Sequence, residues 1–379
     1  MTITWAAALL AAIWGAYAFV GQRWRIAPRL ASPQPQATAA RVVAVVPARN
    51  EASELPATLP ALLAQDYEPL TVVLVDDHST DGTAEVARRI VAESGRDDRL
   101  IVVNAAELPP GWTGKVWAQQ QGLERARQLG AEWVWFTDAD IRHDPDVLTR
   151  LLSAADRSQR DFVSIMARLR CQNSFEKLLI PAFTYFFAGL YPFQRIGDDH
   201  SRQAGAAGGC MLVRRSVLDR IGGVSAIRDA VIDDVALGRA CKAAGARLFL
   251  GYHPGVNSTR GYERGADIWN MVSRSAYTQL GYNPLALFGC VLGLAFVFIV
   301  PLAAVLYGPL SAKLFGLIAY SAMVRTYRPM VVYLGNDPLW ALLLPLAAVL
   351  YTGMTISSAW RHHTGDGAAW KGRSYGPLS

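Results

Sequence analysis

The stretch Trp133-Val-Trp-Phe-Thr-Asp-Ala-Asp140 decides the fold of this 379-residue chain. It joins a short apolar run to two aspartates, Asp138 and Asp140, that are separated by a single residue. Side chains two positions apart on extended backbone point the same way, so both carboxylates are expected just beyond the end of a strand. Ligands of open α/β sheets bind at that edge. Paired oxygen ligands there favour Mg²⁺ or Mn²⁺ beside substrate phosphates, and a plain surface turn is the alternative.

Outward from this stretch, extended and helical patterns alternate along the chain. This order predicts an α/β domain with a mostly parallel, doubly wound sheet. The motifs then lie at the carboxyl ends of strands, where a ligand would bind. The expected strands cover 42–46, 71–75, 100–103 and 132–136, and the expected helices cover 54–65, a segment after Gly82, and 115–129.

Two polar loops follow the first two expected strands. Pro47-Ala-Arg-Asn-Glu51 offers backbone amides and polar side chains, although a plain turn has the same composition. Asp76-Asp-His-Ser-Thr-Asp-Gly82 contains residues that commonly cap helices. Capping does not explain the adjacent Asp76 and Asp77, because neighbouring like charges are costly without an ion or hydrogen-bond donors.

Two further motifs place charge at the start of expected helices. Gly114-Lys115 opens one helix, where the lysine can lie beside a phosphate or simply reach solvent as a surface side chain. Ile232-Asp233-Asp234-Val235 opens another. One of the two acids can cap the helix, which leaves the other free for acid–base chemistry.

The composition excludes an ordinary soluble protein, since 52% of the residues are hydrophobic and only 18% are charged. Three uncharged runs, 2–22, 275–312 and 338–360, each contain the ~20 apolar residues that span a bilayer. A shorter run, Leu314–Val324, is followed by Arg325 and Arg328. It is either interfacial or a further span closed by arginines that reach the headgroups.

Basic residues at 23, 25 and 29 follow the first run, so it is interpreted as a retained anchor with its carboxyl end in the cytoplasm. The predicted division is an anchor (1–22), a linker (23–40), a cytosolic α/β domain (41–282), a membrane region with two or three spans (283–360) and a tail (361–379). Four cysteines without paired spacing indicate neither zinc nor disulfides. The net charge of +6 suits anionic lipid and phosphates, and no basic run interleaved with aromatics indicates nucleic acid.

Together these motifs resemble the family 2 glycosyltransferases of the GT-A type. The resemblance runs from Pro47-Ala-Arg-Asn-Glu51 to Ile232-Asp-Asp-Val-Ala-Leu237, where the family commonly has Glu-Asp before a leucine. In its membrane pattern and in Trp370-Lys-Gly-Arg373, the chain resembles the bacterial hopene-associated glycosyltransferases and, more distantly, ceramide glucosyltransferase. This resemblance implies a GT-A domain on the cytosolic face of the bacterial inner membrane.

The resemblance also implies a reaction and a role for each matching residue. A sugar would pass from a nucleotide-diphosphate sugar, UDP-linked by expectation, to a hydroxyl of a lipid such as a hopanoid. Mg²⁺ or Mn²⁺ would bridge the diphosphate. The implied roles are base and ribose binding by Ala48, Glu51, Asp76 and Asp77, nucleotide contact by Lys115, nucleotide or sugar contact by Asp138, metal binding by Asp140, and proton removal from the acceptor by Asp234.

One departure from the family concerns polymer synthesis. Processive members carry Gln-x-x-Arg-Trp, whereas the matching stretch here is Trp269-Asn-Met-Val-Ser-Arg-Ser-Ala-Tyr277. Arg274 remains and is expected to neutralise the leaving diphosphate, or to be an ordinary charge on an amphipathic helix. A single transfer is therefore favoured over a polysaccharide synthase, and a non-catalytic scaffold is the other alternative. The aromatic segment 174–193 is expected to lie at the membrane interface, with a buried core helix as the alternative.

Overall fold

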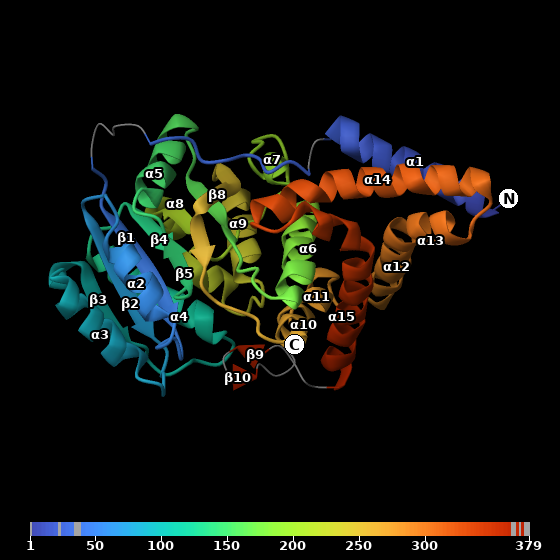
Figure 1. Cartoon of the computed structure of the whole chain (residues 1–379). Helices are drawn as coiled ribbons and strands as arrows, with labels where there is room; N and C mark the ends of the chain where they lie inside the picture. Colours follow the sequence, from blue (N-terminus) through green and yellow to red (C-terminus); the bar gives the residue numbers. More distant parts are fainter. Residues whose placement is uncertain (1, 22–23, 34–38, 365–368, 371–372, 375–379) are drawn as a thin grey trace.

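The structure is a computed structural model that describes residues 2–21, 24–33, 39–364, 369–370 and 373–374. A sheet covered by helices forms one side of the molecule, and the long helices α1 (Thr2–Ala16) and α14 (Leu310–Tyr333) project from it (Figure 1). The positions Lys371 and Gly372 of the carboxyl-terminal motif lie outside the described residues.

One eight-stranded sheet carries the candidate site. Its first four strands are parallel, as the sequence predicted. The second half is mixed, because β7 runs antiparallel to both of its neighbours and β5 antiparallel to β8, whereas β6 and β8 are parallel. The strand order is β3 (Leu100–Asn104), β2 (Leu70–Asp76), β1 (Val42–Ala48), β4 (Trp133–Phe136), β7 (Met211–Arg214), β6 (Phe162–Arg168), β8 (Leu248–Ser258) and β5 (Ile141–His143).

Helices cover both faces of this sheet, which confirms the doubly wound arrangement. Alternate residues of β1 belong to two different cores, Val43 and Val45 to one, and Val42 and Val46 to the other. The period of two along a strand buried on both faces produces this division. The first core includes residues of α4 (Gly114–Gln128) and α9 (Asp233–Ala243), and the second those of α2 (Leu55–Leu63), α3 (Thr83–Ser94) and α5 (Val147–Arg157).

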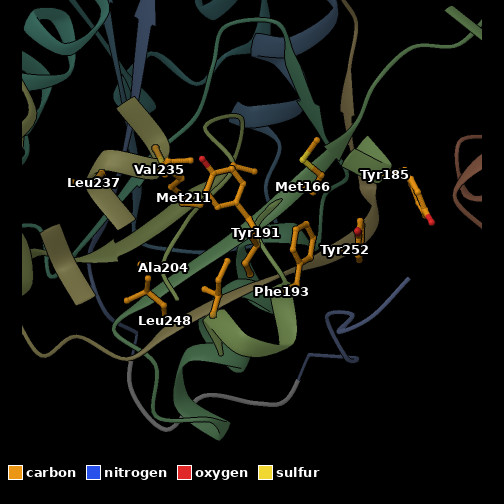
Figure 2. Close-up of a cluster of buried hydrophobic side chains, with 14 of the residues drawn as sticks. Met166, Tyr185, Tyr191, Phe193, Ala204, Met211, Val235, Leu237, Leu248 and Tyr252 are labelled. Atoms are coloured by element: carbon orange, nitrogen blue, oxygen red, sulfur yellow. The ribbon is translucent and has the colours of Figure 1, made fainter. Parts of the chain in front are cut away.

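Helix α6 (Ser174–Leu190) links the sheet to the carboxyl-terminal helices. Its start is fixed by a capping box, in which Asn173 accepts from the amide of Glu176 and Glu176 accepts in return. Figure 2 shows the core beside its end, where Tyr191 and Phe193 lie with Met211 and Tyr252 from the strands. The middle of α6 is buried, so the buried alternative describes it better than the interfacial prediction does.

Three helical segments among the described residues are long and apolar enough to cross a membrane: Thr2–Val20, Pro284–Tyr307 and Pro338–Thr364. The first consists of α1 and a π-helical turn, η1 (Tyr17–Gly21). The second combines α12 (Pro284–Leu294), the π-turn η4 (Ala295–Ile299) and α13 (Val300–Tyr307), and the third combines η5 (Pro338–Leu343) and α15 (Leu344–Thr364).

Helices α1 and α14 lie side by side and run in the same direction (Figure 1). Thr4 near the start of α1 lies 3.3 Å from Ser311 near the start of α14, measured between their hydroxyl oxygens. At the other end, the guanidinium of Arg325 lies 5.3 Å from the ring centre of Phe19. Helix α13 packs closely against α14 at Gly316, where a Cβ would come within 2.7 Å of a backbone oxygen.

Helix α15 instead packs against the sheet-bearing part of the chain. Its Ser357 and Ser358 accept hydrogen bonds from the Trp269 indole and the Tyr277 amide, at 3.1 and 3.0 Å. Trp269 lies on α10 (Gly265–Ser273) and Tyr277 on α11 (Ala276–Gln279). The remaining short elements are η2 (Asp97–Arg99), α7 (Phe193–Ile196), α8 (Arg215–Arg220), η3 (Gly223–Ile227), β9 (Ala369–Trp370) and β10 (Arg373–Ser374).

Candidate active site

The predicted charged residues of three distant motifs meet at the carboxyl end of β4. Lys115 begins α4, Asp138 follows β4, and Asp233 begins α9. The Lys115 ammonium lies 2.8 Å from Asp138 Oδ1 and 3.2 Å from Asp233 Oδ2. Gln119, one turn further along α4, donates to the same Asp233 oxygen at 3.2 Å. The structure thus joins the lysine and acidic motifs that the sequence placed more than a hundred residues apart.

Burial alone would lower the pKa of Lys115, but Asp138 and Asp233 raise it above the ordinary value. Burial also raises the pKa of Asp138, an effect that Lys115 opposes. The lysine therefore stays charged over the whole physiological range. A fixed positive charge at a helix start beside a strand end is suited to bind a phosphate group.

Asp234 is held at the amino-terminal end of α9. Its Oδ2 accepts from the Gly208 amide at 2.8 Å, and its Oδ1 accepts from the Val235 amide at 2.7 Å. Burial, followed by the neighbouring Asp233, raises the pKa of Asp234 to about 7, and Lys115 opposes that rise. A carboxylate with a pKa near neutrality can accept a proton during a reaction. Neither acid is the residue that caps the helix, because Ile232 occupies that position.

Asp140 pairs with an arginine that the sequence analysis did not select. Arg260 Nε donates to Asp140 Oδ2 at 2.5 Å, and its Nη2 donates to both oxygens of Glu51, at 2.9 and 3.0 Å. Thr259 fixes this segment, since its amide donates to the Asp140 carbonyl at 2.8 Å. Burial alone would lower the pKa of Arg260, but Asp140 and Glu51 raise it.

The carboxylates near Asp140 supply only part of the oxygen ligands that a divalent cation takes. No group of three or more His, Cys, Asp or Glu side chains is arranged to hold a metal in the part of the chain that the structure describes. Mg²⁺ commonly needs only one or two protein carboxylates when phosphates supply further oxygens. Asp138 and Asp140 both lie in the turn after β4, and the charge of Asp140 adds to burial in raising the pKa of Asp138.

The loops after β1 and β2 are tied together. The Asp77 amide donates to the Ala48 carbonyl at 2.8 Å, and Asp77 itself is fully buried. The Ser79 hydroxyl donates to Asp76 Oδ1, and the Ser79 amide donates to the same oxygen at 3.3 Å. Arg49 lies across both loops and donates to the Asp77 carbonyl at 2.6 Å. The Asp77 carboxylate lies 3.2 Å from His78 Nδ1 and 3.9 Å from Arg49 Nη1, so both adjacent acids have polar partners and the two loops form one wall.

Arg274 ends α10 with its side chain exposed. It lies close enough to Tyr262 to lower that group's pKa, while burial and the Asp140 charge together raise the Tyr262 pKa to about 12. Tyr262 in turn is bound to α6, since its amide donates to Glu176 Oε1 at 2.7 Å. Arg274 and Asp140 therefore approach the same tyrosine from different elements.

Sequence reasoning missed Arg260, the bond from the Gly208 amide to Asp234 and the pairing of Asp233 with Lys115. Arg260 follows β8, a strand that the sequence pattern did not predict, so nothing in the sequence singled it out. His143, three residues after Asp140, is fully buried. Burial lowers its pKa to about 3, and its Nε2 lies 2.8 Å from the Thr137 hydroxyl. It is a core residue.

Comparisons with known proteins identify the family to which the chain belongs. Residues 43–222 match the model of glycosyl transferase family 2, and residues 133–355, more than half of the chain, match that of glycosyl transferase family group 2. An Aeromonas hydrophila undecaprenyl-phosphate 4-deoxy-4-formamido-L-arabinose transferase is 32% identical over 142 residues. That match covers 36% of this chain and 40% of the relative.

A solved structure shares the fold. The mannosyltransferase of Pyrobaculum calidifontis, solved in complex with GDP-Man and Mn²⁺, aligns with a TM-score of 0.55 and 22% identity. The alignment covers 91% of this chain and 98% of that one. At this identity the likeness establishes the GT-A fold and nothing further. Together with the family matches, it shows that this chain is an enzyme of the family 2 glycosyltransferases.

Proposed function

We propose that this glycosyltransferase moves a sugar from a nucleotide-diphosphate donor, a UDP-sugar, to the hydroxyl of a membrane lipid. The observation that carries the proposal is the position of Asp234. Its carboxylate, with a pKa raised to about 7, lies beside the Lys115 ammonium and the acids at the end of β4. A proton acceptor and an anion-binding group are thereby held in one site, as transfer from a diphosphate to a hydroxyl requires.

The proposed reaction is a single displacement. The acceptor oxygen bonds to the anomeric carbon as the bond from that carbon to the diphosphate oxygen breaks. The proton of the acceptor hydroxyl passes to Asp234, and the electron pair of the broken bond leaves with the nucleoside diphosphate. Attack from the side opposite the leaving group inverts the anomeric configuration. Gly208 keeps Asp234 oriented, because its amide holds Oδ2 at 2.8 Å.

The donor is assigned to the wall of the site formed by β1, β2 and β4. In this proposal, the base and ribose lie against Ala48, Glu51, Asp76 and Asp77, and Lys115 and Asp138 contact the nucleotide and sugar. Arg274 would neutralise the leaving diphosphate. Asp140, with Asp138 near it, would hold Mg²⁺ or Mn²⁺, and a bound cation there would stabilise negative charge on the diphosphate. Because Arg260 occupies Asp140 Oδ2, it would exchange this carboxylate for a phosphate oxygen when the donor binds.

A lipid acceptor is supported by the surroundings of the site. The curated relative from Aeromonas acts, by its name, on undecaprenyl phosphate. Helices α10 and α11, which flank Arg274, are bonded to α15 through Trp269 and Tyr277. The outward side of α15 exposes large apolar side chains along its length, including Leu346, Val349, Ile356 and Trp360. A lipid surface next to the site would cover these apolar side chains and would bring the lipid acceptor close to the site. A hopanoid-type polycyclic alcohol is the acceptor we favour.

The contacts also support a membrane placement that differs in one helix from the simplest sequence interpretation. Helices α1 and α14 run in the same direction, since Thr4 lies beside Ser311 at their starts and Phe19 lies beside Arg325 further along. Both helices would therefore cross the bilayer together. The segment α12–α13 would cross in the opposite direction. By length and hydropathy, η5 and α15 together qualify as a span and α14 does not, but the second half of α15 is bonded to α10 and α11. We therefore assign α15 to the cytosolic surface of the inner membrane, beside the catalytic domain.

The test is donor turnover by the full chain purified in detergent, with UDP-sugars and with GDP-sugars as the comparison, with and without Mn²⁺. We expect Mn²⁺-dependent release of UDP, and loss of one glycolipid from cells that lack the protein. Absence of turnover with every donor would indicate the scaffold alternative. Products that carry many sugars would indicate a polysaccharide synthase instead of a single transfer.

A further inference from the structure

A groove of about 680 Å³ lies beside α14, outside the candidate active site. Its walls come from three segments: the stretch after α1, one side of α14, and η5. They combine aromatic and aliphatic side chains with two guanidinium groups. The lining residues are Trp24, Leu317, Tyr320, Ser321, Val324, Arg325, Arg328, Pro329 and Leu342.

The two arginines of this groove, Arg325 and Arg328, are exposed. Arg325 lies over the rings of Phe19 and Trp24, at 5.3 and 5.9 Å from their centres. Arg328 follows on the same side of α14, three residues later. Within the described residues, neither arginine forms an ion pair with an acidic side chain. Two positive charges therefore border an apolar groove without a protein anion to balance them.

The position of the groove within the bilayer follows from the membrane placement proposed above, and this inference rests on that proposal. Arg325 lies at the end of α1 that leads into the catalytic domain, next to Trp24, where tryptophan is common at membrane surfaces. Leu317 lies two turns back along α14, toward the bilayer centre. The charged end of the groove is then at headgroup level, and its apolar end is among the acyl chains.

We propose that this groove binds an anionic phospholipid of the cytosolic leaflet. The phosphate lies between the guanidinium groups of Arg325 and Arg328, and an acyl chain runs along Leu317 and Leu342. Charge complementarity selects a headgroup of net negative charge, because a zwitterionic headgroup brings its own cation to the site. The apolar lining selects a lipid over free phosphate, which has no group to cover those side chains.

The test measures bound lipid directly. The full chain would be placed in nanodiscs of equal phosphatidylglycerol and phosphatidylcholine, extracted into mild detergent, and examined by native mass spectrometry. We expect retained phosphatidylglycerol to exceed phosphatidylcholine at least tenfold. The double variant Arg325→Gln/Arg328→Gln should lose that preference. The matched control Arg88→Gln/Arg89→Gln changes two exposed arginines of α3 and should keep it.

A second variant distinguishes binding in the groove from a general effect of lost positive charge. Leu317→Trp fills the apolar end, keeps both arginines, and should also reduce phosphatidylglycerol retention. Equal retention of the two lipids by wild type, or unchanged retention in both variants, overturns the proposal. Displacement of the lipid by millimolar inorganic phosphate would overturn it in favour of a free-anion site. UDP-sugar turnover, measured in parallel, distinguishes failure of the lipid site from failure of the proposed reaction, and size-exclusion chromatography with circular dichroism reports folding.

Discussion

Arg260 donates from Nε to Asp140 Oδ2 at 2.5 Å while its Nη2 reaches both oxygens of Glu51. One guanidinium therefore neutralises the acid at the end of β4 and the acid in the loop after β1. Without it, two carboxylates would lie close together with no compensating charge, which is costly in a partly buried site. A cation that binds Asp140 has to compete with this arginine or to displace it.

Asp140→Asn is expected to reduce metal-dependent donor turnover by about a thousandfold. The variant lacks a charged metal ligand, and the metal is expected to lower the free energy of the transition state by several kcal/mol. The control is Asp98→Asn, which changes an exposed acid of η2. Turnover is measured as UDP release at matched Mn²⁺ concentrations. Near wild-type turnover in Asp140→Asn would remove the metal role from this residue.

Arg260→Gln is expected to bind Mn²⁺ more tightly than wild type in the absence of donor, by about fivefold to tenfold, which corresponds to about 1–1.4 kcal/mol. Removal of the guanidinium frees Asp140 and leaves Glu51 without its partner, so a cation gains attraction. Isothermal titration calorimetry measures the affinity. Weaker binding in the variant would show that Arg260 supports the cation site and does not compete with it.

The parallel half of the fold could be predicted because strands such as Val42–Ala48 are apolar throughout and are followed by polar loops. The mixed half could not, because β7 and β5 have only four and three residues and their pairing is set by contacts distant in sequence. The same reason explains the missed site residues. Arg260 reaches Glu51 across more than two hundred residues, and Gly208 holds Asp234 through its backbone, which no side-chain pattern records.

Asp234→Asn is expected to lower the rate of sugar transfer by about a hundredfold to ten-thousandfold, because the acceptor proton loses its base. Donor affinity should change little, since the proposed donor contacts lie on Lys115 and the loops after β1 and β2. Calorimetry with a UDP-sugar and a transfer assay measure the two effects separately. Loss of donor binding with the loss of transfer would make Asp234 a donor or metal ligand instead.

Transfer by the wild type is expected to rise with pH and to reach half its maximum near pH 7, where Asp234 loses its proton. The folded-state pKa exceeds the ordinary value of 3.8, so the folded protein binds this proton more tightly than the unfolded chain does. The free energy of unfolding should therefore fall as the pH rises from about 4 to about 7. Asp234→Asn should lack this component and be the more stable protein above pH 7. A flat rate profile between pH 5 and about 8 would contradict the assignment.

The membrane placement is tested at the connection between α14 and η5. If α14 crosses the bilayer beside α1, Leu339 lies on the cytosolic side; if α14 lies on the outer surface and α15 crosses, Leu339 lies outside. Leu339→Cys is expected to react with an impermeant thiol reagent only after cells are permeabilised, because its exposed side chain is then reached from the cytosol. The control Ser311→Cys, at the far end of α14, should react in intact cells. Labelling of Leu339→Cys in intact cells would assign the span to α15. A cysteine at Ser379 should also stay protected until permeabilisation, and labelling there in intact cells would instead require four spans.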